Sequence, residues 1–480
     1  MPVRAAAIIS RKRLPIVGAA SLFMLGACAT LPADRVPAAQ AAAPARAITS
    51  FTAQKAAWPG ADWWTAYNDP QLNALITEAL QTSPTLAQAQ ARVRAANALE
   101  SVSRASLLPT LSANASVSAA KQSYNTGFPN SFEPQGYKAY GTATLDFNYE
   151  FDFWGKNRAA IAAASSDARA AQAEAAQTQL ALSAAIADVY ADLARLYAER
   201  DITEKALAVR QQTADLVIRR VKAGLDTQGE QRQAEAGAPA ARAQIAALDE
   251  AIGLTRNRLA ALLGAGPDRG LTIERPAAPS LAAFGLPENL AADLLGRRPD
   301  IVAARWRAEA AAKRIKQSEA AFYPNVNLAA YVGVNVLNLE NLTRSGSDIG
   351  SIGPAISLPI FHGGRLRSNL LFADAERDAA IAAYNGTVVE ALRQVADAVT
   401  SAKALDGRLA ESKAALQAYE DAYDVASRRY DGGLANYQSV LLAEDAVLAQ
   451  RLAVADLQSR AFSLDVALVR ALGGGFVNPS

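Results

Sequence analysis

The 480-residue chain is poor in the residue types that most enzymes use. It contains one cysteine, one histidine and two methionines. A single cysteine excludes a disulfide within the chain, and the single histidine, His362, excludes a metal site built from several imidazoles. A glycine-rich phosphate loop is also missing, because Gly432-Gly433 is not followed by Lys-Ser or Lys-Thr. We therefore expect neither an enzyme nor a bound metal or cofactor.

Aromatic residues are scarce as well, at 7%, although 51% of the chain is hydrophobic. Much of the apolar share is alanine, which is the best helix former and lets neighbouring helices approach closely. The composition therefore favours long, tightly packed helices over a thick globular core.

The first 27 residues have the layout of a secretory signal. Four basic residues within 4–13 precede the apolar stretch 14–25, which at about 12 residues is too short to span a bilayer as a helix. Cys28 then stands where a bacterial lipoprotein signal places its acylated cysteine, so we expect cleavage before it and a palmitate-type anchor. Without 1–27 the chain has 44 basic residues (48 minus 4) and 46 acidic ones, which argues against a nucleic-acid partner.

The rest of the chain contains one unit twice. Gly155-Lys156 matches Gly364-Arg365, and Gly224-Leu225 matches Gly433-Leu434, each time 209 residues later (364 minus 155, 433 minus 224). A repeat of this length is too large for a solenoid and predicts two homologous halves in one body. The expected boundaries are a lipid tether with a short helical segment at 28–83, the first half at 84–264, a linker at 265–298, the second half at 299–473 and a tail at 474–480.

Each half contains two predicted β-strands. Apolar and polar side chains alternate strictly over 142–153, the pattern of a strand with one lipid-facing and one wet face. Its predicted partner is 110–118, and 326–334 with 352–360 repeats the pair. We therefore expect β-hairpins within 109–153 and 324–361. Two soluble hairpins with one buried face would show the same alternation.

The sequence also predicts two very long helices. Neither glycine nor proline occurs over 156–222, and as one helix these roughly 67 residues would reach about 100 Å. The equivalent segment in the second half is 365–431. Shorter helices at 84–108 and 227–263 together nearly match that length. Two short helices could thus stack end to end beside one long helix in each half.

Four strands cannot close a barrel with a lumen, because about eight strands are the practical minimum, and lipid does not tolerate open sheet edges. Several chains must therefore contribute strands. We predict a mainly α fold with a membrane β-barrel, in which the long helices continue the pore. A structural coiled-coil lipoprotein of the periplasm would explain the helices but not the strands.

These features resemble the TolC-type outer membrane factors, in the lipoprotein branch that serves RND-type tripartite efflux pumps. The resemblance covers about 55–473 and rests on a combination of motifs: Trp63-Trp64 with Asp69-Pro70, Arg297-Arg298-Pro299-Asp300-Ile301, Phe322-Tyr323-Pro324, Leu358-Pro359-Ile360-Phe361 and Asn436-Tyr437. It implies a homotrimer in the outer membrane of a Gram-negative bacterium, with a 12-stranded barrel, a 12-helix coiled-coil tunnel and contacts to outer membrane lipids.

The same resemblance implies a function. A periplasmic membrane-fusion adaptor and an inner membrane RND pump would open the channel, which would export antibiotics or other small molecules without catalysis. A type I protein secretion duct shares this fold and is the alternative.

The resemblance also implies a gate at the periplasmic tip, where polar contacts between helices close the tunnel. In this family a tyrosine of the second long helix contacts a carboxylate on the neighbouring short helix, and these positions fall on Tyr430 and Glu230. The turns expected to contact the adaptor hold Gly224-Leu225 and Gly433-Leu434. Ordinary helix packing by Tyr430, with Glu230 in solvent, is the competing interpretation.

The chain departs from the family in two places near this tip. Acidic rings usually follow the second tip turn, but the matching positions hold Ser439 and Leu442. Other carboxylates could concentrate negative potential there in three copies, and the candidates are Asp226, Asp431, Glu444 and Asp445. In addition, Gly237 and Pro239 interrupt a helix that is normally continuous, and the proline should kink it.

Overall fold

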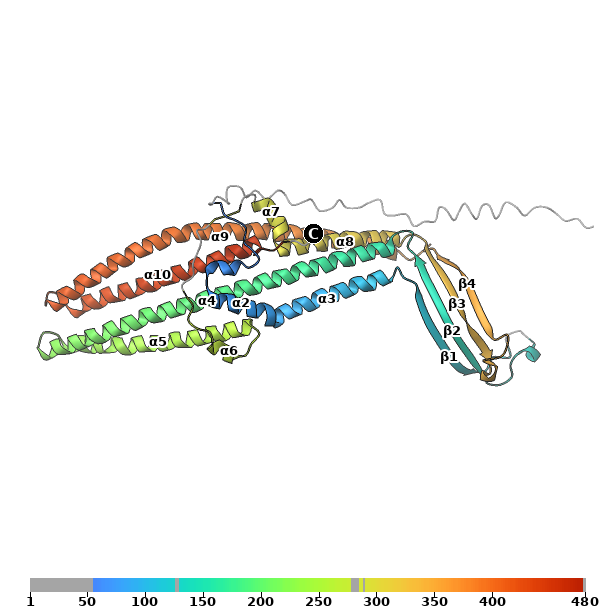
Figure 1. Cartoon of the computed structure of the whole chain (residues 1–480), viewed down its shortest axis with the longest axis horizontal. Helices are drawn as coiled ribbons and strands as arrows, with labels where there is room; N and C mark the ends of the chain where they lie inside the picture. Colours follow the sequence, from blue (N-terminus) through green and yellow to red (C-terminus); the bar gives the residue numbers. More distant parts are fainter. Residues whose placement is uncertain (1–54, 126–128, 278–284, 288–289, 478–480) are drawn as a thin grey trace, which may run out of the picture. The chain divides into compact units, whose positions relative to one another are not determined.

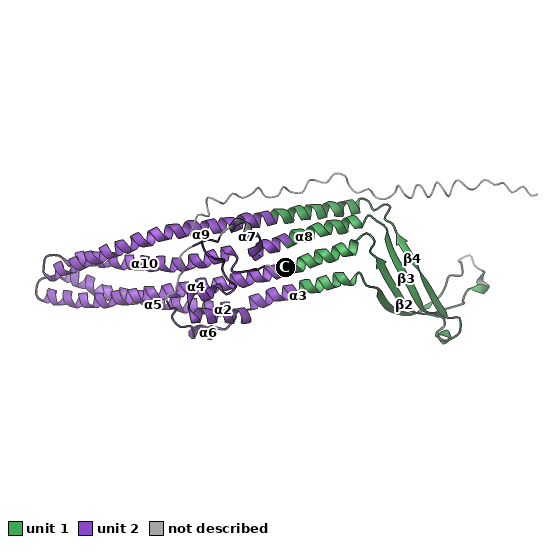
Figure 2. Ribbon diagram, turned by 45° about the horizontal axis from the view of Figure 1, so that its top comes forward, with its two compact units in different colours: residues 1–40, 95–168, 306–382 green, residues 41–94, 169–305, 383–480 purple. Residues whose placement is uncertain are grey.

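The computed structural model describes residues 55–125, 129–277, 285–287 and 290–477. The predicted signal, Cys28 and the last three residues lie outside this part of the chain. The described residues form two compact units, coloured separately in Figure 2: unit 1 contains 95–168 and 306–382, and unit 2 contains the rest.

The first half of the repeat and the segment before it contain eight helical or extended elements up to the linker (Figure 1). In chain order they are η1 (Trp63–Tyr67), α2 (Pro70–Thr82), α3 (Pro84–Ala105), β1 (Thr110–Ala120), η2 (Asn130–Phe132), β2 (Lys138–Phe151), α4 (Lys156–Lys222) and α5 (Gln228–Leu262).

The linker and the second half supply the remaining elements of the described chain. They are α6 (Pro267–Leu271), α7 (Leu290–Arg297), α8 (Pro299–Ala320), β3 (Asn325–Leu337), η3 (Leu339–Asn341), β4 (Asp348–Ser357), α9 (Arg365–Asp431) and α10 (Tyr437–Leu472).

Both long helices are confirmed with the ends that the sequence predicts. α4 and α9 have 67 residues each, and α9 continues through Gly386 and Gly407. No helix among the described residues is both long enough and apolar enough to cross a bilayer.

The end-to-end arrangement of the short helices is confirmed at both junctions, which lie in unit 2. The side chain of Thr82, just before α3, donates to the backbone oxygen of Leu263 at the end of α5 (2.6 Å). Arg298, just before α8, donates to the backbone oxygen of Ala471 near the end of α10 (2.9 Å). Each half therefore pairs one long helix with two shorter helices that meet end to end.

The sheet lies in unit 1 and has four antiparallel strands in sequence order, β1-β2-β3-β4. Leu145 stands opposite Ala113 on β1 and Val332 on β3, whereas its neighbour Asp146 stands opposite Ser112 and Tyr331. Because side chains alternate between the faces of a strand, this register gathers the apolar residues on one face and most polar ones on the other.

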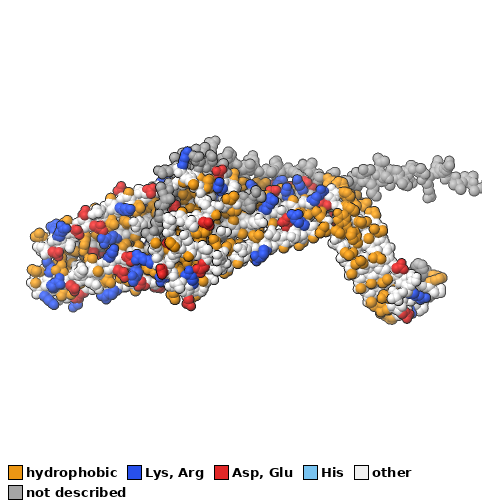
Figure 3. Space-filling model, in the orientation of Figure 1, with side chains coloured by type: hydrophobic (Ala, Val, Ile, Leu, Met, Phe, Trp, Pro, Cys, Tyr) orange, Lys and Arg blue, Asp and Glu red, His pale blue; other side chains and the backbone are white. Residues whose placement is uncertain are grey.

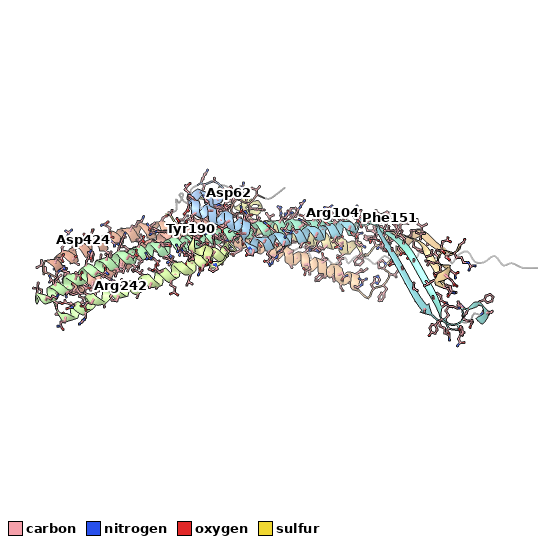
Figure 4. All side chains as sticks on the ribbon, turned by 60° about the horizontal axis from the view of Figure 1, so that its bottom comes forward. Asp62, Arg104, Phe151, Tyr190, Arg242 and Asp424 are labelled. Atoms are coloured by element: carbon pink, nitrogen blue, oxygen red, sulfur yellow. The ribbon has the colours of Figure 1, made fainter. Side chains whose placement is uncertain are left out.

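The apolar face of the sheet is uncovered in the single chain. Leu111 is 65% exposed and Ile352 76% exposed, and hydrophobic side chains cover much of the sheet on the face shown in Figure 3. Phe151, at the end of β2 and labelled in Figure 4, belongs to this apolar set and stacks on Phe153 with ring centroids 5.7 Å apart. An apolar outer face is what lipid requires.

In unit 2 the largest hydrophobic cluster lies where η1 and α2 pack on the long helices. Tyr67 contacts the ring of Phe462 on α10 at a centroid distance of 4.5 Å. The carboxylate of Asp69 caps α2, accepting from the backbone N–H of Leu72 (3.0 Å), and also accepts from the hydroxyl of Tyr190 on α4 (2.8 Å). Tyr190 is labelled in Figure 4. These contacts fix the N-terminal segment to the middle of α4.

Candidate functional site

Two helix pairs of unit 2 end in equivalent turns. The first helix pair is α4 with α5 and the second helix pair is α9 with α10, both antiparallel (Figure 1). Gly224 and Gly433 have φ of +76° and +74°, a conformation that L side chains rarely adopt. The leucines that follow them, Leu225 and Leu434, are 66% and 74% exposed. The structure thus places all four predicted tip residues at exposed turns.

One buried tyrosine joins the two turns. Tyr430, 1% exposed at the end of α9, donates its hydroxyl hydrogen to the carboxylate of Asp226 in the first turn. Arg220 of α4 donates its Nε to the same carboxylate (3.0 Å) and its Nη1 to the backbone oxygen of Tyr430 (3.1 Å). Its guanidinium lies 4.4 Å from the centroid of the tyrosine ring. The three residues therefore connect the first helix pair to the second.

The tyrosine stays a hydrogen-bond donor at neutral pH. Burial, followed by the bond to Asp226, raises the pKa of Tyr430 well above its ordinary value of 10.0. A donor that faces a carboxylate in a shielded place forms a charge-assisted hydrogen bond, which is about twice as strong as a neutral one.

The predicted contact between Tyr430 and Glu230 is wrong. Glu230 instead accepts the backbone N–H of Thr227 at 2.8 Å, while its own N–H donates to the hydroxyl of Thr227 at 3.2 Å. This is a capping box, in which the third residue of a helix turns back to the residue before its start. The Thr-x-x-Glu motif was visible in the sequence, and Asp226 is the residue left in the turn to meet the tyrosine.

A second polar contact between the helix pairs involves a residue that sequence reasoning missed. Arg210 of α4 donates its Nε to Glu444 (2.9 Å) and its Nη2 to Asp445 (2.8 Å), both on α10. Glu444 is buried, and burial raises the pKa of its carboxyl, against the opposing effect of Arg210. Glu444 and Asp445 are therefore paired with an arginine within the chain.

A small apolar cluster lies between these two polar contacts. It consists of Ala214, Val217, Ala234, Tyr430, Tyr437 and Val440 and draws on all four helices. The rings of Tyr430 and Tyr437 are the largest of these buried side chains, so hydrophobic packing also joins the two helix pairs here. Polar contacts and hydrophobic packing therefore both connect the two helix pairs in this region.

Comparison with known proteins identifies the family of this chain. A sequence model of the outer membrane efflux protein family matches residues 75–265 and 290–474. The chain belongs to this family. It is 38% identical to the fusaric acid resistance protein FusA of Burkholderia cepacia, over 74% of this chain and 68% of that protein. It is 32% identical to the multidrug resistance outer membrane protein MdtP of Escherichia coli K12, over 87% of each.

Solved structures agree with this assignment. The outer membrane protein VceC of Vibrio cholerae superimposes with a TM-score of 0.82 at 47% identity, over 87% of this chain and all of that one. The CmeC outer membrane channel of Campylobacter jejuni superimposes with a TM-score of 0.83, over 94% of this chain and 96% of that one; at 23% identity this shows the fold alone. The chain is an outer membrane efflux channel of TolC type, with a helical tunnel and a β-barrel.

In this channel the acidic candidates at the tip have separate environments. Asp226 is occupied by Tyr430 and Arg220, and Glu444 and Asp445 are occupied by Arg210. Asp431 is exposed, as are Ser439 and Leu442. Within the described residues, no group of three or more His, Cys, Asp or Glu side chains could hold a metal ion.

Helix α5 of the channel is continuous across Gly237 and Pro239. α5 runs from Gln228 to Leu262 with Pro239 inside it. Gly237 faces Arg210, since a Cβ at this glycine would lie 3.3 Å from Cδ of the arginine. The glycine therefore makes room for a side chain of the neighbouring helix.

Proposed function

We propose that the chain is the outer membrane duct of a tripartite RND-type efflux pump. Three copies would place four strands each in one barrel, which removes the open edges of β1 and β4 and turns the apolar face to lipid. A periplasmic adaptor and an inner membrane pump would complete the assembly. The duct itself would be passive, without catalysis or cofactor.

The observation that carries this proposal is the contact of Tyr430 with Asp226 and Arg220. It connects the two helix pairs through a few polar bonds, so it can hold a tip closed and still be released. The same proposal assigns Glu230 to capping, Asp431 to the exposed tip surface, and Gly224-Leu225 with Gly433-Leu434 to adaptor contact.

We further infer that residues 1–27 are removed and that Cys28 is acylated, which would anchor each subunit to the outer membrane. The substrates would be small organic compounds. In support, two relatives are named for resistance to fusaric acid and to multiple drugs.

Deletion and complementation test the function. Loss of the gene should increase susceptibility to small toxic compounds, and the intact gene should restore resistance. The purified protein should migrate as a trimer and form pores in planar bilayers, and an adaptor and a pump should be captured with it after crosslinking in cells. A defect in protein export with unchanged drug susceptibility would point to type I secretion instead.

A further inference from the structure

Arg210 forms a contact between the helix pairs that is separate from the one at Tyr430. It lies ten residues before Arg220 on α4 (220 minus 210), which is about 15 Å along the helix. Its guanidinium binds one carboxylate through Nε, Glu444 at 2.9 Å, and another through Nη2, Asp445 at 2.8 Å. Two separate polar contacts therefore connect the helix pairs: the one at Tyr430 near the tip turns and the one at Arg210 further from them.

The ion pair of Arg210 with Glu444 is shielded from water. The side chains of Arg210 and Glu444 are 15% and 8% exposed, whereas that of Asp445 is 56% exposed. A buried carboxylate needs its counter-ion, because an unpaired charge in a poorly solvated place is strongly unfavourable. Moving α10 away from α4 would strand Glu444 unless water enters at the same moment.

Helix α5 has a glycine, Gly237, where the side chain of Arg210 packs against it. A Cβ at Gly237 of α5 would lie 3.3 Å from Cδ of Arg210 and 3.6 Å from its Cγ. Glycine lowers the stability of a helix interior, so its presence here needs a reason. The reason is steric, since the stem of Arg210 packs against α5 at this position.

Other arginines of the same helices form ion pairs of a different kind. Arg451 of α10 pairs with Glu420 of α9 (2.6 Å), and Arg200 of α4 pairs with Asp249 of α5 (2.6 Å). Both bridges stay inside one helix pair and would move with it as a body. Arg210 differs because its partners belong to the other pair.

We propose that Arg210, seated against Gly237, is a second closing contact of the duct, which must release Glu444 and Asp445 before the second helix pair can move away from the first. This inference rests on the proposed function of a gated duct. It assigns a role to Gly237, which the Tyr430 contact leaves unexplained.

The test measures single-channel conductance of the purified trimer in planar bilayers. Arg210→Gln should raise conductance several-fold. Since this variant leaves Glu444 unpaired, the neutral triple variant Arg210→Gln, Glu444→Gln, Asp445→Asn removes the contact without a stranded charge and should do the same. The charge exchange Arg210→Glu with Glu444→Arg should return conductance toward the wild-type value.

Matched control variants distinguish the specific effect of the Arg210 contact from a general loss of stability at the tip. Arg451→Gln and Arg200→Gln remove ion pairs within one helix pair and should leave conductance unchanged. Gly237→Val should displace Arg210 and raise conductance, whereas Gly253→Val on the same helix, where a Cβ meets nothing within 4 Å, should not. Arg210→Gln combined with Tyr430→Phe should exceed either change alone, because well-separated sites act independently.

The outcomes are distinguishable. A triple variant that forms a trimer and conducts no more than the wild type would overturn the role of Arg210 while leaving the proposed function intact. An equal rise with Arg451→Gln would also overturn it, since any lost bridge would then loosen the tip. A wild-type trimer that forms no pore would overturn the proposed function, and this inference with it.

Discussion

The hydroxyl of Tyr430 donates to the carboxylate of Asp226, and the guanidinium of Arg220 binds that carboxylate and also lies over the tyrosine ring. One acidic side chain thus receives two donors from two different long helices. The ring supplies packing and the hydroxyl supplies the link, so the two contributions can be separated by removing a single oxygen atom.

Tyr430→Phe should raise the single-channel conductance of the trimer. The phenylalanine keeps the ring against Arg220 but loses the bond to Asp226, so the tip opens more readily while the fold persists. Tyr419→Phe is the control, because this tyrosine lies on the same helix and is 44% exposed. Unchanged conductance in a folded Tyr430→Phe trimer would refute a closing role for the bond.

Glu230→Ala should leave conductance unchanged and lower stability. Its carboxylate caps the start of α5, whereas the hydroxyl of Tyr430 donates to Asp226, and loss of a capping interaction typically costs about 1 kcal/mol. Thermal unfolding of the variant measures the loss, with Glu250→Ala in the middle of α5 as a control. A conductance increase as large as that of Tyr430→Phe would show that Glu230 also helps to hold the tip closed.

Asp188 on α4 should make stability depend on pH. Burial raises the pKa of its carboxyl from 3.8 to about 6, with Arg470 and Arg258 opposing the shift and Asp192 adding to it. The folded state therefore binds the proton more tightly than the unfolded state does. The contribution of Asp188 to the free energy of unfolding is fully present below pH 3.8 and is lost as the pH rises toward 6. Asp188→Asn should flatten the unfolding temperature of the trimer over this window, and an unchanged slope would contradict the assignment.

Gly473→Ala should reduce the amount of folded trimer more than Gly433→Ala does. Both glycines have positive φ, +95° and +74°, and an alanine in that conformation costs about 1–2 kcal/mol. At Gly473 a Cβ would also lie 2.1 Å from the backbone oxygen of Arg297, whereas at Gly433 it meets nothing within 4 Å. Trimer yield and unfolding temperature compare the two, and equal effects would mean that the chain relaxes around the clash.

Cys28→Ala should abolish incorporation of labelled palmitate. The variant should still sediment with the outer membrane, because the β-barrel holds the subunit there independently of the acyl chain. Labelling that persists in the variant would show that the anchor lies elsewhere, and a soluble variant would show that the barrel alone does not retain the protein.

The long helices and the strands could be located from local pattern. A run of 67 residues without glycine or proline has few alternatives to a helix, and strict alternation over 142–153 has few alternatives to a strand. The helix lengths then indicated that the two short helices of each half meet end to end, and the contacts of Leu263 and Ala471 confirm this. The helices and strands are determined by residues that lie close together in the sequence.

The polar contacts between the helix pairs depend on residues that are far apart in the sequence. Tyr430 and Asp226 are separated by 204 residues, and Arg210 and Glu444 by 234. The local Thr-x-x-Glu motif commits Glu230 to capping its own helix, but only the packing of the helices shows that Asp226 meets the tyrosine. Arg210 likewise becomes significant only once α5 presents Gly237 to it and α10 presents two acids. Local sequence determines the helices, and only their packing decides which charges meet.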